Sequence, residues 1–220
     1  MTTRFTNRTG GVSTGAFASL NLGSHVGDNP EHVARNREIL GEKIGPVQFM
    51  NQVHGDRIAI IEQATNEDPT ADALVTGIPG IALAVMVADC IPLLLKSPHV
   101  VAAVHVGRKG LVNDVTRKTL ELMREMGANQ ITAIIGPAIC GTCYEVSEEI
   151  HSEVTAVHPF ADSRTTSGTF ALDLPAALRS VLSDEGVGIV NKFQCTVETV
   201  DLFSYRRDGL TGRQAGVIAL

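Results

Sequence analysis

The stretch Ile81-Ala82-Leu83-Ala84-Val85-Met86-Val87-Ala88 decides the fold, and Asp89 and Cys90 follow it directly. Its residues are all apolar, without the alternation of apolar and polar side chains that marks a strand with one face in water. Such an unbroken run is typical of a strand that is buried on both faces. We therefore predict a central strand over residues 81–88, with Cys90 just beyond its end.

Shorter runs rich in Val, Ile and Ala predict additional strands at residues 57–62, 100–106, 130–135 and 214–220. The tripeptide Ser97-Pro98-His99 separates two apolar runs closely enough to predict a hairpin. Helices are predicted at residues 31–41, 111–126, 145–158 and 175–185. This mixture of elements predicts an α/β sandwich and leaves open whether its sheet is parallel, mixed or antiparallel.

Length and composition favour one well-filled domain that binds small molecules. A chain of 220 residues with 44% hydrophobic content is large enough for a substantial core. The net charge of -6, the aromatic content of only 4% and the lack of Trp disfavour a nucleic-acid partner. Neither a secretory signal nor an apolar run of membrane-spanning length is present, so we expect a cytoplasmic protein with no membrane partner.

Three residues of metal-binding types, His54, Cys90 and His105, each lie where an apolar run ends. Two imidazoles and one thiolate suit a catalytic zinc, which keeps its fourth position for water or substrate. The separations of 36 and 15 residues are far from those of structural zinc motifs, so spacing adds little. The same atoms suit a Cys nucleophile activated by His, with Asp89 orienting the His. From the residues alone, both chemistries stay open.

The remaining cysteines, Cys140, Cys143 and Cys195, do not form a complete zinc or redox motif in the sequence. Cys-x-x-Cys spacing, as in Cys140-Gly141-Thr142-Cys143, occurs in redox centres and in zinc knuckles. Here no second pair accompanies it, and Pro137 and Tyr144 predict a turn rather than a thioredoxin-like strand–helix junction. Cys195 has no partner in the sequence, and we expect it to be buried.

The order of motifs along the chain resembles the YfiH family, also called the laccase-domain or polyphenol oxidase family. The matching blocks run from end to end: Phe5-Thr6-x-Arg8-x-Gly10-Gly11-Val12-Ser13, Ser19-Leu20-Asn21-Leu22-Gly23, Val26-Gly27-Asp28, Gln52-Val53-His54-Gly55, Ala71-Asp72-Ala73-Leu74-Val75-Thr76, Ala88-Asp89-Cys90-Ile91-Pro92-Leu93, His105-x-Gly107, Ile135-Gly136-Pro137 and Phe203-Ser204-Tyr205-Arg206-Arg207-Asp208. Several independent blocks in the right order make this resemblance specific.

The resemblance implies a single-domain α/β sandwich with a mixed sheet over residues 1–220, and one zinc held by His54, Cys90 and His105. It also implies phosphorolysis of adenosine, inosine and S-methyl-5′-thioadenosine, with adenosine deamination as a further activity. The partners would be a purine nucleoside and phosphate, and the protein would be a monomer or a small homo-oligomer. We predict Asp89 as a catalytic residue, and the cationic side chains that we predict to bind substrate are Arg8, Lys109 and Arg206.

Three alternatives remain: a copper polyphenol oxidase, a Cys–His hydrolase of an amide such as a cell-wall precursor, and a non-catalytic partner protein. A multicopper centre needs many imidazoles, and the 7 His of this chain include no His-x-His pair, so copper ranks below zinc.

One block departs from the family. Family members usually carry His-x-Gly-Trp-Arg-Gly, and this chain has His105-Val106-Gly107-Arg108-Lys109-Gly110. Lysine keeps the charge of the usual Arg but loses the two-pronged donor geometry that suits phosphate. We therefore expect substrate affinity or preference to differ here.

Overall fold

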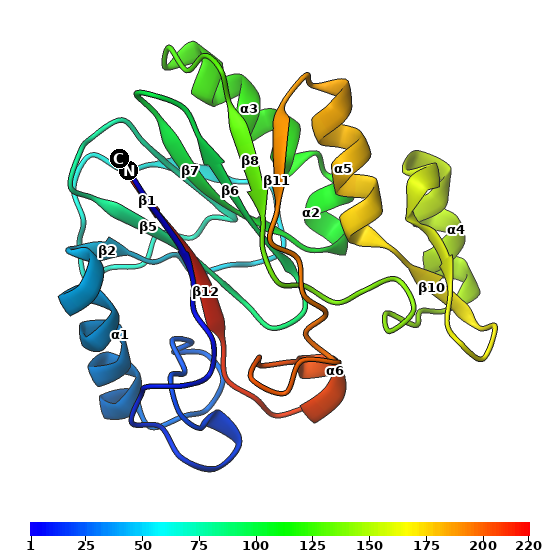
Figure 1. Ribbon diagram of the computed structural model, residues 1–220, viewed down its shortest axis with the longest axis horizontal. Helices are drawn as coiled ribbons and strands as arrows, with labels where there is room; N and C mark the ends of the chain where they lie inside the picture. Colours follow the sequence, from blue (N-terminus) through cyan, green and yellow to red (C-terminus); the bar gives the residue numbers. More distant parts are fainter.

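Two β-sheets form the centre of the molecule (Figure 1), and the computed structural model describes residues 1–220. The four-stranded sheet has the order β1 (Thr2–Phe5), β12 (Gln214–Ala219), β5 (Ala82–Val87) and β2 (Val47–Gln48). The six-stranded sheet has the order β11 (Gly188–Asn191), β8 (Thr132–Ile135), β6 (Ile91–Lys96), β7 (Val101–Val106), β4 (Ala73–Thr76) and β3 (Ile58–Ile60). A separate hairpin pairs β9 (Asp162–Arg164) with β10 (Phe170–Leu172).

Both large sheets are mixed, which settles the strand direction that the sequence left open. In the six-stranded sheet, β6, β7, β4 and β8 pair antiparallel, and the outer strands β3 and β11 pair parallel with their neighbours. In the other sheet, β2 is parallel to β5, and β12 is antiparallel to both β5 and β1. The result is a single-domain α/β fold with mixed sheets.

Helices surround the two sheets. They are α1 (Pro30–Ile44), α2 (Arg108–Val112), α3 (Val115–Glu125), α4 (Glu148–Val157), α5 (Leu174–Asp184) and the short α6 (Tyr205–Asp208). One 3-10 turn spans Gly15–Phe17 and another spans Pro159–Ala161. In Figure 1, α1 lies beside the four-stranded sheet, and α2, α3, α4 and α5 lie on the other side of the molecule.

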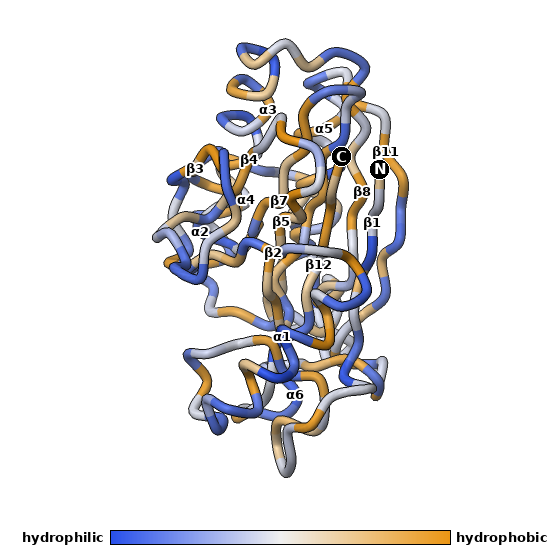
Figure 2. Tube along the Cα trace, turned by 90° about the vertical axis from the view of Figure 1, so that its left-hand side faces the viewer, coloured by the Kyte–Doolittle hydropathy of each residue, from blue (hydrophilic) through white to orange (hydrophobic).

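The core is divided by these layers into three clusters of buried apolar side chains. One cluster lies between the sheets and contains Leu83 and Val85 of β5 together with Val101 and Ala103 of β7. A second joins the six-stranded sheet to its helices, and a third joins the four-stranded sheet to α1. Figure 2 shows the apolar colour gathered along the central strands.

The predicted central strand is confirmed as β5. Each of its residues is buried, because one face meets the other sheet and the opposite face meets α1. The hairpin at Ser97-Pro98-His99 is also confirmed, since it joins the antiparallel strands β6 and β7.

The continuous helix predicted over residues 111–126 is wrong. The chain forms α2 and α3 instead, and they meet at Asn113 and Asp114, where Asp114 has a φ of 60°. Left-handed backbone ends a helix, and Asp tolerates it better than most residues. The apolar spacing continues across the break, so periodicity alone could not reveal it. No helix in the structure is both long enough and apolar enough to cross a membrane.

Candidate functional site

The three residues His54, Cys90 and His105, here called the His–Cys–His cluster, meet at one end of the sandwich. Cys90 lies in the short connection that leaves β5 in one sheet and enters β6 in the other. His105 is near the end of β7, on the face that Val101 and Ala103 turn towards the space between the sheets. His54 belongs to the loop between β2 and β3, where its φ is 59°. The crossing between sheets therefore brings together residues that are distant in sequence.

The donor atoms of this cluster are close enough for one metal ion to bind them all. One ligand atom from each residue lies within 4.8 Å of the others, and Cys90 Sγ is 3.8 Å from His54 Nε2. The two imidazole rings pack edge to face, with centroids 4.7 Å apart. A Cβ at Gly107 would lie 3.0 Å from Cys90 Sγ and 3.1 Å from His54 Cδ2, so a side chain there would crowd the ligands.

A buried carboxylate, Asp72, holds both histidines in place. It accepts a 2.8 Å hydrogen bond from His105 Nδ1, which leaves Nε2 of that ring directed at the cluster. The same carboxylate accepts backbone N–H groups of Val53, His54 and Gly55 at 3.3, 2.9 and 2.7 Å. Asp72 therefore fixes one ligand through its ring and the other through its loop.

The electrostatics of the cluster favour a thiolate at Cys90. Burial opposes ionisation of the Cys90 thiol. The charges and hydrogen bonds of His105 and His54 outweigh burial and lower the pKa of Cys90 to about 6. Burial likewise opposes the charged form of His105, but Cys90 and Asp72 outweigh it and raise the pKa of that imidazole to about 9. A thiolate is the form of cysteine that binds a metal and the form that acts as a nucleophile.

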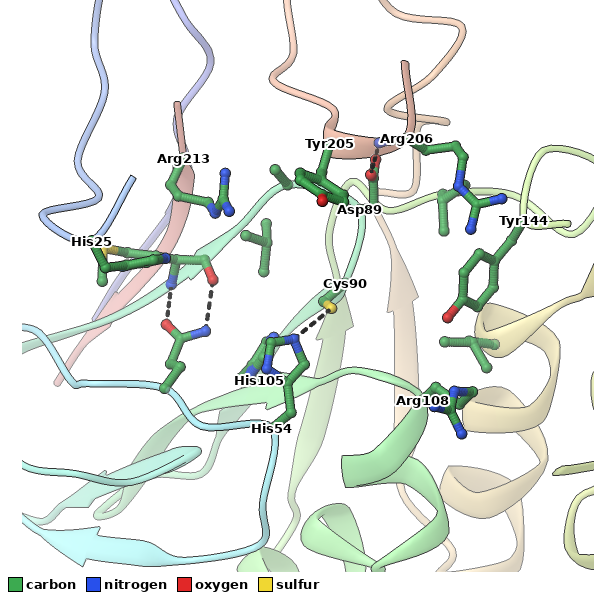
Figure 3. A pocket seen from close by; sticks show the side chains of 16 residues that line it. His25, His54, Asp89, Cys90, His105, Arg108, Tyr144, Tyr205, Arg206 and Arg213 are labelled. Carbon is green, nitrogen blue, oxygen red and sulfur yellow. Dashed lines mark hydrogen bonds between the residues drawn. The ribbon is translucent and has the colours of Figure 1, made fainter. Parts of the chain in front are cut away.

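The cluster lies in a cavity of about 400 Å³ (Figure 3). This volume falls within the range of small-molecule sites. The lining is half apolar, with aromatic rings from Tyr144 and Tyr205 and the imidazole of His25 beside the cluster residues. Gln52 forms part of the lining. Its amide is held by two 2.8 Å hydrogen bonds with the backbone of Met86, beyond the end of the β2–β5 pairing. The arrangement can enclose a small, partly aromatic ligand against the cluster.

Three guanidinium groups, those of Arg108, Arg206 and Arg213, also line the cavity. Arg108 lies 3.8 Å from the Glu153 carboxylate. Arg206 donates to the Glu145 carbonyl, and Arg213 donates to carbonyls of its own segment, so neither pairs with a carboxylate. Burial lowers the pKa of Arg213, opposed by nearby Cys90 and Asp89. Arginines without carboxylate partners suit an anionic ligand.

Of the three cationic residues that the sequence predicted to bind substrate, the structure brings only Arg206 to this cavity. Arg8 donates to the carbonyls of Ala18 and Val200 and lies 4.9 Å over the ring of Phe203, which ties it to the chain's own backbone. Lys109 is exposed and does not line the cavity, and its neighbour Arg108 does.

Asp89 lines the cavity but does not bond to either histidine, so the expectation that it orients a His is wrong. Its φ of 97° turns the chain between the sheets, and its carboxylate accepts from Thr196 Oγ1, Ser204 Oγ and the Arg206 backbone N–H at 2.6, 2.7 and 2.7 Å. These bonds join the β5–β6 connection to the C-terminal segments.

Sequence reasoning did not assign Asp72, Tyr144 or Arg213 to the site. Asp72 carried a signal, because an acid directly before the apolar residues of β4 needs a buried partner. Tyr144 and Arg213 carried none, since each lies in a segment that reaches the cavity only through the tertiary fold.

Comparisons with known proteins show the family to which the chain belongs. Residues 2–220 match the family described as multi-copper polyphenol oxidoreductase laccase. A protein of Corynebacterium glutamicum named purine nucleoside phosphorylase is 46% identical, over 98% of this chain and 93% of its own length. The crystal structure of protein NMB0706 from Neisseria meningitidis has a TM-score of 0.91 and 42% identity, and covers 99% of this chain and 93% of the other. The crystal structure of the Bacillus licheniformis hypothetical protein YfiH has a TM-score of 0.89 and 30% identity, covering 99% and 92%.

The fold and the cavity thus define an α/β sandwich protein with a His–Cys–His cluster at the crossing of its sheets. The chain belongs to the YfiH, or laccase-domain, family, as its motif order indicated.

Proposed function

We propose that this protein is a zinc-dependent purine nucleoside phosphorylase that accepts adenosine, inosine and S-methyl-5′-thioadenosine, and that it also deaminates adenosine. The observation that carries the proposal is the cavity, which combines a metal-binding cluster, aromatic side chains and unpaired arginines within about 400 Å³. The names of its relatives supply the reaction, because proteins called purine nucleoside phosphorylases match nearly the whole chain.

The donor set fits a single zinc ion held by His54, Cys90 and His105. Two imidazoles and a thiolate are common zinc ligands, and three protein ligands are typical of a catalytic site. No other group of potential ligands in the chain contains a histidine, which disfavours a multicopper centre. When bound, zinc would supply Lewis acidity at the cavity wall.

Phosphorolysis needs a phosphate held against the sugar. A phosphate oxygen forms a bond to the anomeric carbon as the bond to the base breaks, and the base leaves with the electron pair and takes up a proton. We propose that Arg206 and Arg213 hold the phosphate, because their guanidinium groups lack carboxylate partners. Tyr144 and Tyr205 would pack against the purine ring.

Asp89 serves in this proposal as a positioning residue. Its carboxylate fixes the Arg206 backbone and the Thr196 and Ser204 hydroxyls, so it aligns the wall of the cavity that carries Arg206. The three donors engage both of its carboxylate oxygens, which makes Asp89 a fixed part of the cavity wall.

The test is to incubate adenosine with protein of measured zinc content, with and without phosphate. We expect adenine and ribose 1-phosphate only when phosphate is present, and deamination to inosine in both cases, with conversion of that inosine to hypoxanthine when phosphate is present. His54→Ala should abolish both, and the exposed hairpin residue His99 provides the matched control, His99→Ala. Zinc-loaded protein that yields neither product would contradict the proposal.

A Cys–His hydrolase remains the second candidate, because one observation favours it. The Cys90 thiol is 3.8 Å from His54 Nε2 and its pKa is lowered to about 6, as in a nucleophilic pair. This alternative predicts an amidase activity in zinc-free protein that alkylation of Cys90 removes. The zinc proposal predicts that alkylation removes zinc and phosphorolysis together.

A further inference from the structure

A second group of metal-binding side chains lies outside the cavity. Its members are Cys140, Cys143, Cys195 and Glu198, here called the three-cysteine cluster. One ligand atom from each lies within 4.8 Å of the others, and Cys143 Sγ is 3.8 Å from a Glu198 carboxylate oxygen. None of the four lines the cavity that holds the His–Cys–His cluster.

Backbone hydrogen bonds hold the cluster in place. Cys140 and Cys143 lie in a tight turn closed by the bond from Cys143 N–H to Cys140 O at 3.1 Å. Cys195 and Glu198 lie in a second turn, in which Thr199 N–H donates to Cys195 O at 3.0 Å. The turns follow the parallel strands β8 and β11, and a bridge between Ala138 and Cys195 continues that pairing. The two pairs of ligands are therefore aligned by the sheet.

The position of the first turn is also fixed by its glycine. A Cβ at Gly141 would lie 2.8 Å from Asp173 Cβ and 2.8 Å from Ser163 Oγ, so the backbone packs directly against neighbouring segments. In the second turn, Arg207 donates to the carbonyls of Thr196, Val197 and Thr199. These bonds hold the second turn in place, and the guanidinium charge itself is paired with the Asp208 carboxylate at 2.8 Å.

We propose that the three-cysteine cluster binds a structural zinc ion of its own, independent of the His–Cys–His cluster. Three thiolates and one carboxylate complete the four-coordinate set that structural zinc prefers, and Cys140 and Cys143 have the two-residue separation of zinc motifs. A tetrahedral ion with zinc–sulfur bonds of about 2.3 Å places its sulfurs about 3.8 Å apart, and the ligand atoms of this cluster lie within 4.8 Å of one another. A disulfide would use only two of the three thiols and leave the facing carboxylate without a role.

The proposed ion would stabilise one wall of the cavity. Tyr144, which lines the cavity, directly follows Cys143, and Thr196, which donates to Asp89, directly follows Cys195. By joining the two turns, the ion would fix both residues relative to each other. The His–Cys–His cluster would then lie inside the cavity, and the three-cysteine cluster would lie outside the wall that carries Tyr144.

The direct test is zinc content per chain, measured on reduced protein after zinc loading and removal of loosely bound ions. We expect two equivalents in the unchanged protein and one in Cys140→Ser, and the exposed control variant Thr166→Ala should keep both. Glu198→Gln on the surface should keep the ion but release it to a chelator at least tenfold faster. An equal zinc content in Cys140→Ser and in the unchanged protein would overturn the proposal, whereas a single equivalent that Cys140→Ser loses would place that ion in the three-cysteine cluster.

Cobalt gives a readout that does not depend on the other cluster or on activity. Cys90→Ala removes the only thiol of the His–Cys–His cluster, so thiolate-to-cobalt charge-transfer absorption in this variant can arise only from the three-cysteine cluster. We expect strong absorption from Co²⁺-loaded Cys90→Ala and its loss when Cys140→Ser is added. An absence of this absorption in Cys90→Ala, or a Cys140–Cys143 disulfide in protein prepared without oxidants, would contradict the proposal.

Discussion

The two groups of metal-binding side chains differ in the number of ligands they offer and in their position. The His–Cys–His cluster has three ligands from three distant segments and lies inside the cavity. The three-cysteine cluster has four ligands from two neighbouring turns and lies outside it. Three protein ligands leave a position for substrate and four do not, so the first suits chemistry and the second suits stabilisation. The predictions below test this difference.

The largest expected effect comes from removing a ligand inside the cavity. His54→Ala should lower kcat/KM for phosphorolysis of adenosine by more than about 100-fold, because one of three metal ligands is lost. Zinc content and initial rates, measured on the same preparation, check this. His99→Ala should match the unchanged protein, and a variant with one zinc fewer that is still fully active would show that the cluster is not catalytic.

Asp72→Asn should have the next largest effect. The amide cannot accept all the hydrogen bonds that the carboxylate receives from His105 and the His54 loop. We expect the affinity of the His–Cys–His cluster for zinc, or the activity, to fall by about 10-fold to 100-fold. Chelator competition measures this, and the exposed variant Glu62→Gln is the control. Unchanged affinity and unchanged activity would mean that Asp72 does not position the ligands.

Arg206→Lys should mainly affect phosphate. We expect the KM for phosphate to rise about tenfold, because a charged hydrogen bond contributes about 1.5 kcal/mol and lysine loses the second donor of the guanidinium group. Steady-state rates at varied phosphate measure it, with the exposed Arg4→Lys as control. If the KM for adenosine rises instead, Arg206 contacts the nucleoside.

Removing a ligand of the three-cysteine cluster should have the smallest effect on activity and a clear effect on stability. Cys140→Ser should lower the free energy of unfolding by about 2.7 kcal/mol where free zinc is about 100-fold above its Kd. For a chain of this size that corresponds to a Tm lower by about 2–4 °C for each kcal/mol. Thermal unfolding of both proteins, with and without a chelator, tests it. Equal Tm values in zinc would contradict a structural ion.

The parts of the fold that follow from local patterns were predictable. The apolar run at residues 81–88 predicts β5 because a strand covered on both faces needs apolar side chains at every position. The hairpin before Val100 followed from turn residues between two apolar runs. The break between α2 and α3 did not, because Val115 and Leu111 keep helical spacing across it.

The site was predictable only in part, because most of its contacts are tertiary. The family motifs indicated His54, Cys90 and His105, which the fold brings together. No local pattern shows that the Asp72 carboxylate accepts hydrogen bonds from the His105 ring and the His54 backbone N–H. Nor does one show that Arg8 donates to a backbone carbonyl of its own chain. Cys195 illustrates the limit most clearly. It has no partner in sequence, but the pairing beyond β8 and β11 places it beside Cys140 and Cys143.

Anomalous X-ray scattering from crystals of zinc-loaded protein, recorded on both sides of the zinc absorption edge, would locate the metal ions directly. We expect one zinc peak among His54, Cys90 and His105 and a second within the three-cysteine cluster. The absence of a zinc peak at the His–Cys–His cluster, or a peak there that follows the copper edge instead, would contradict the zinc proposal.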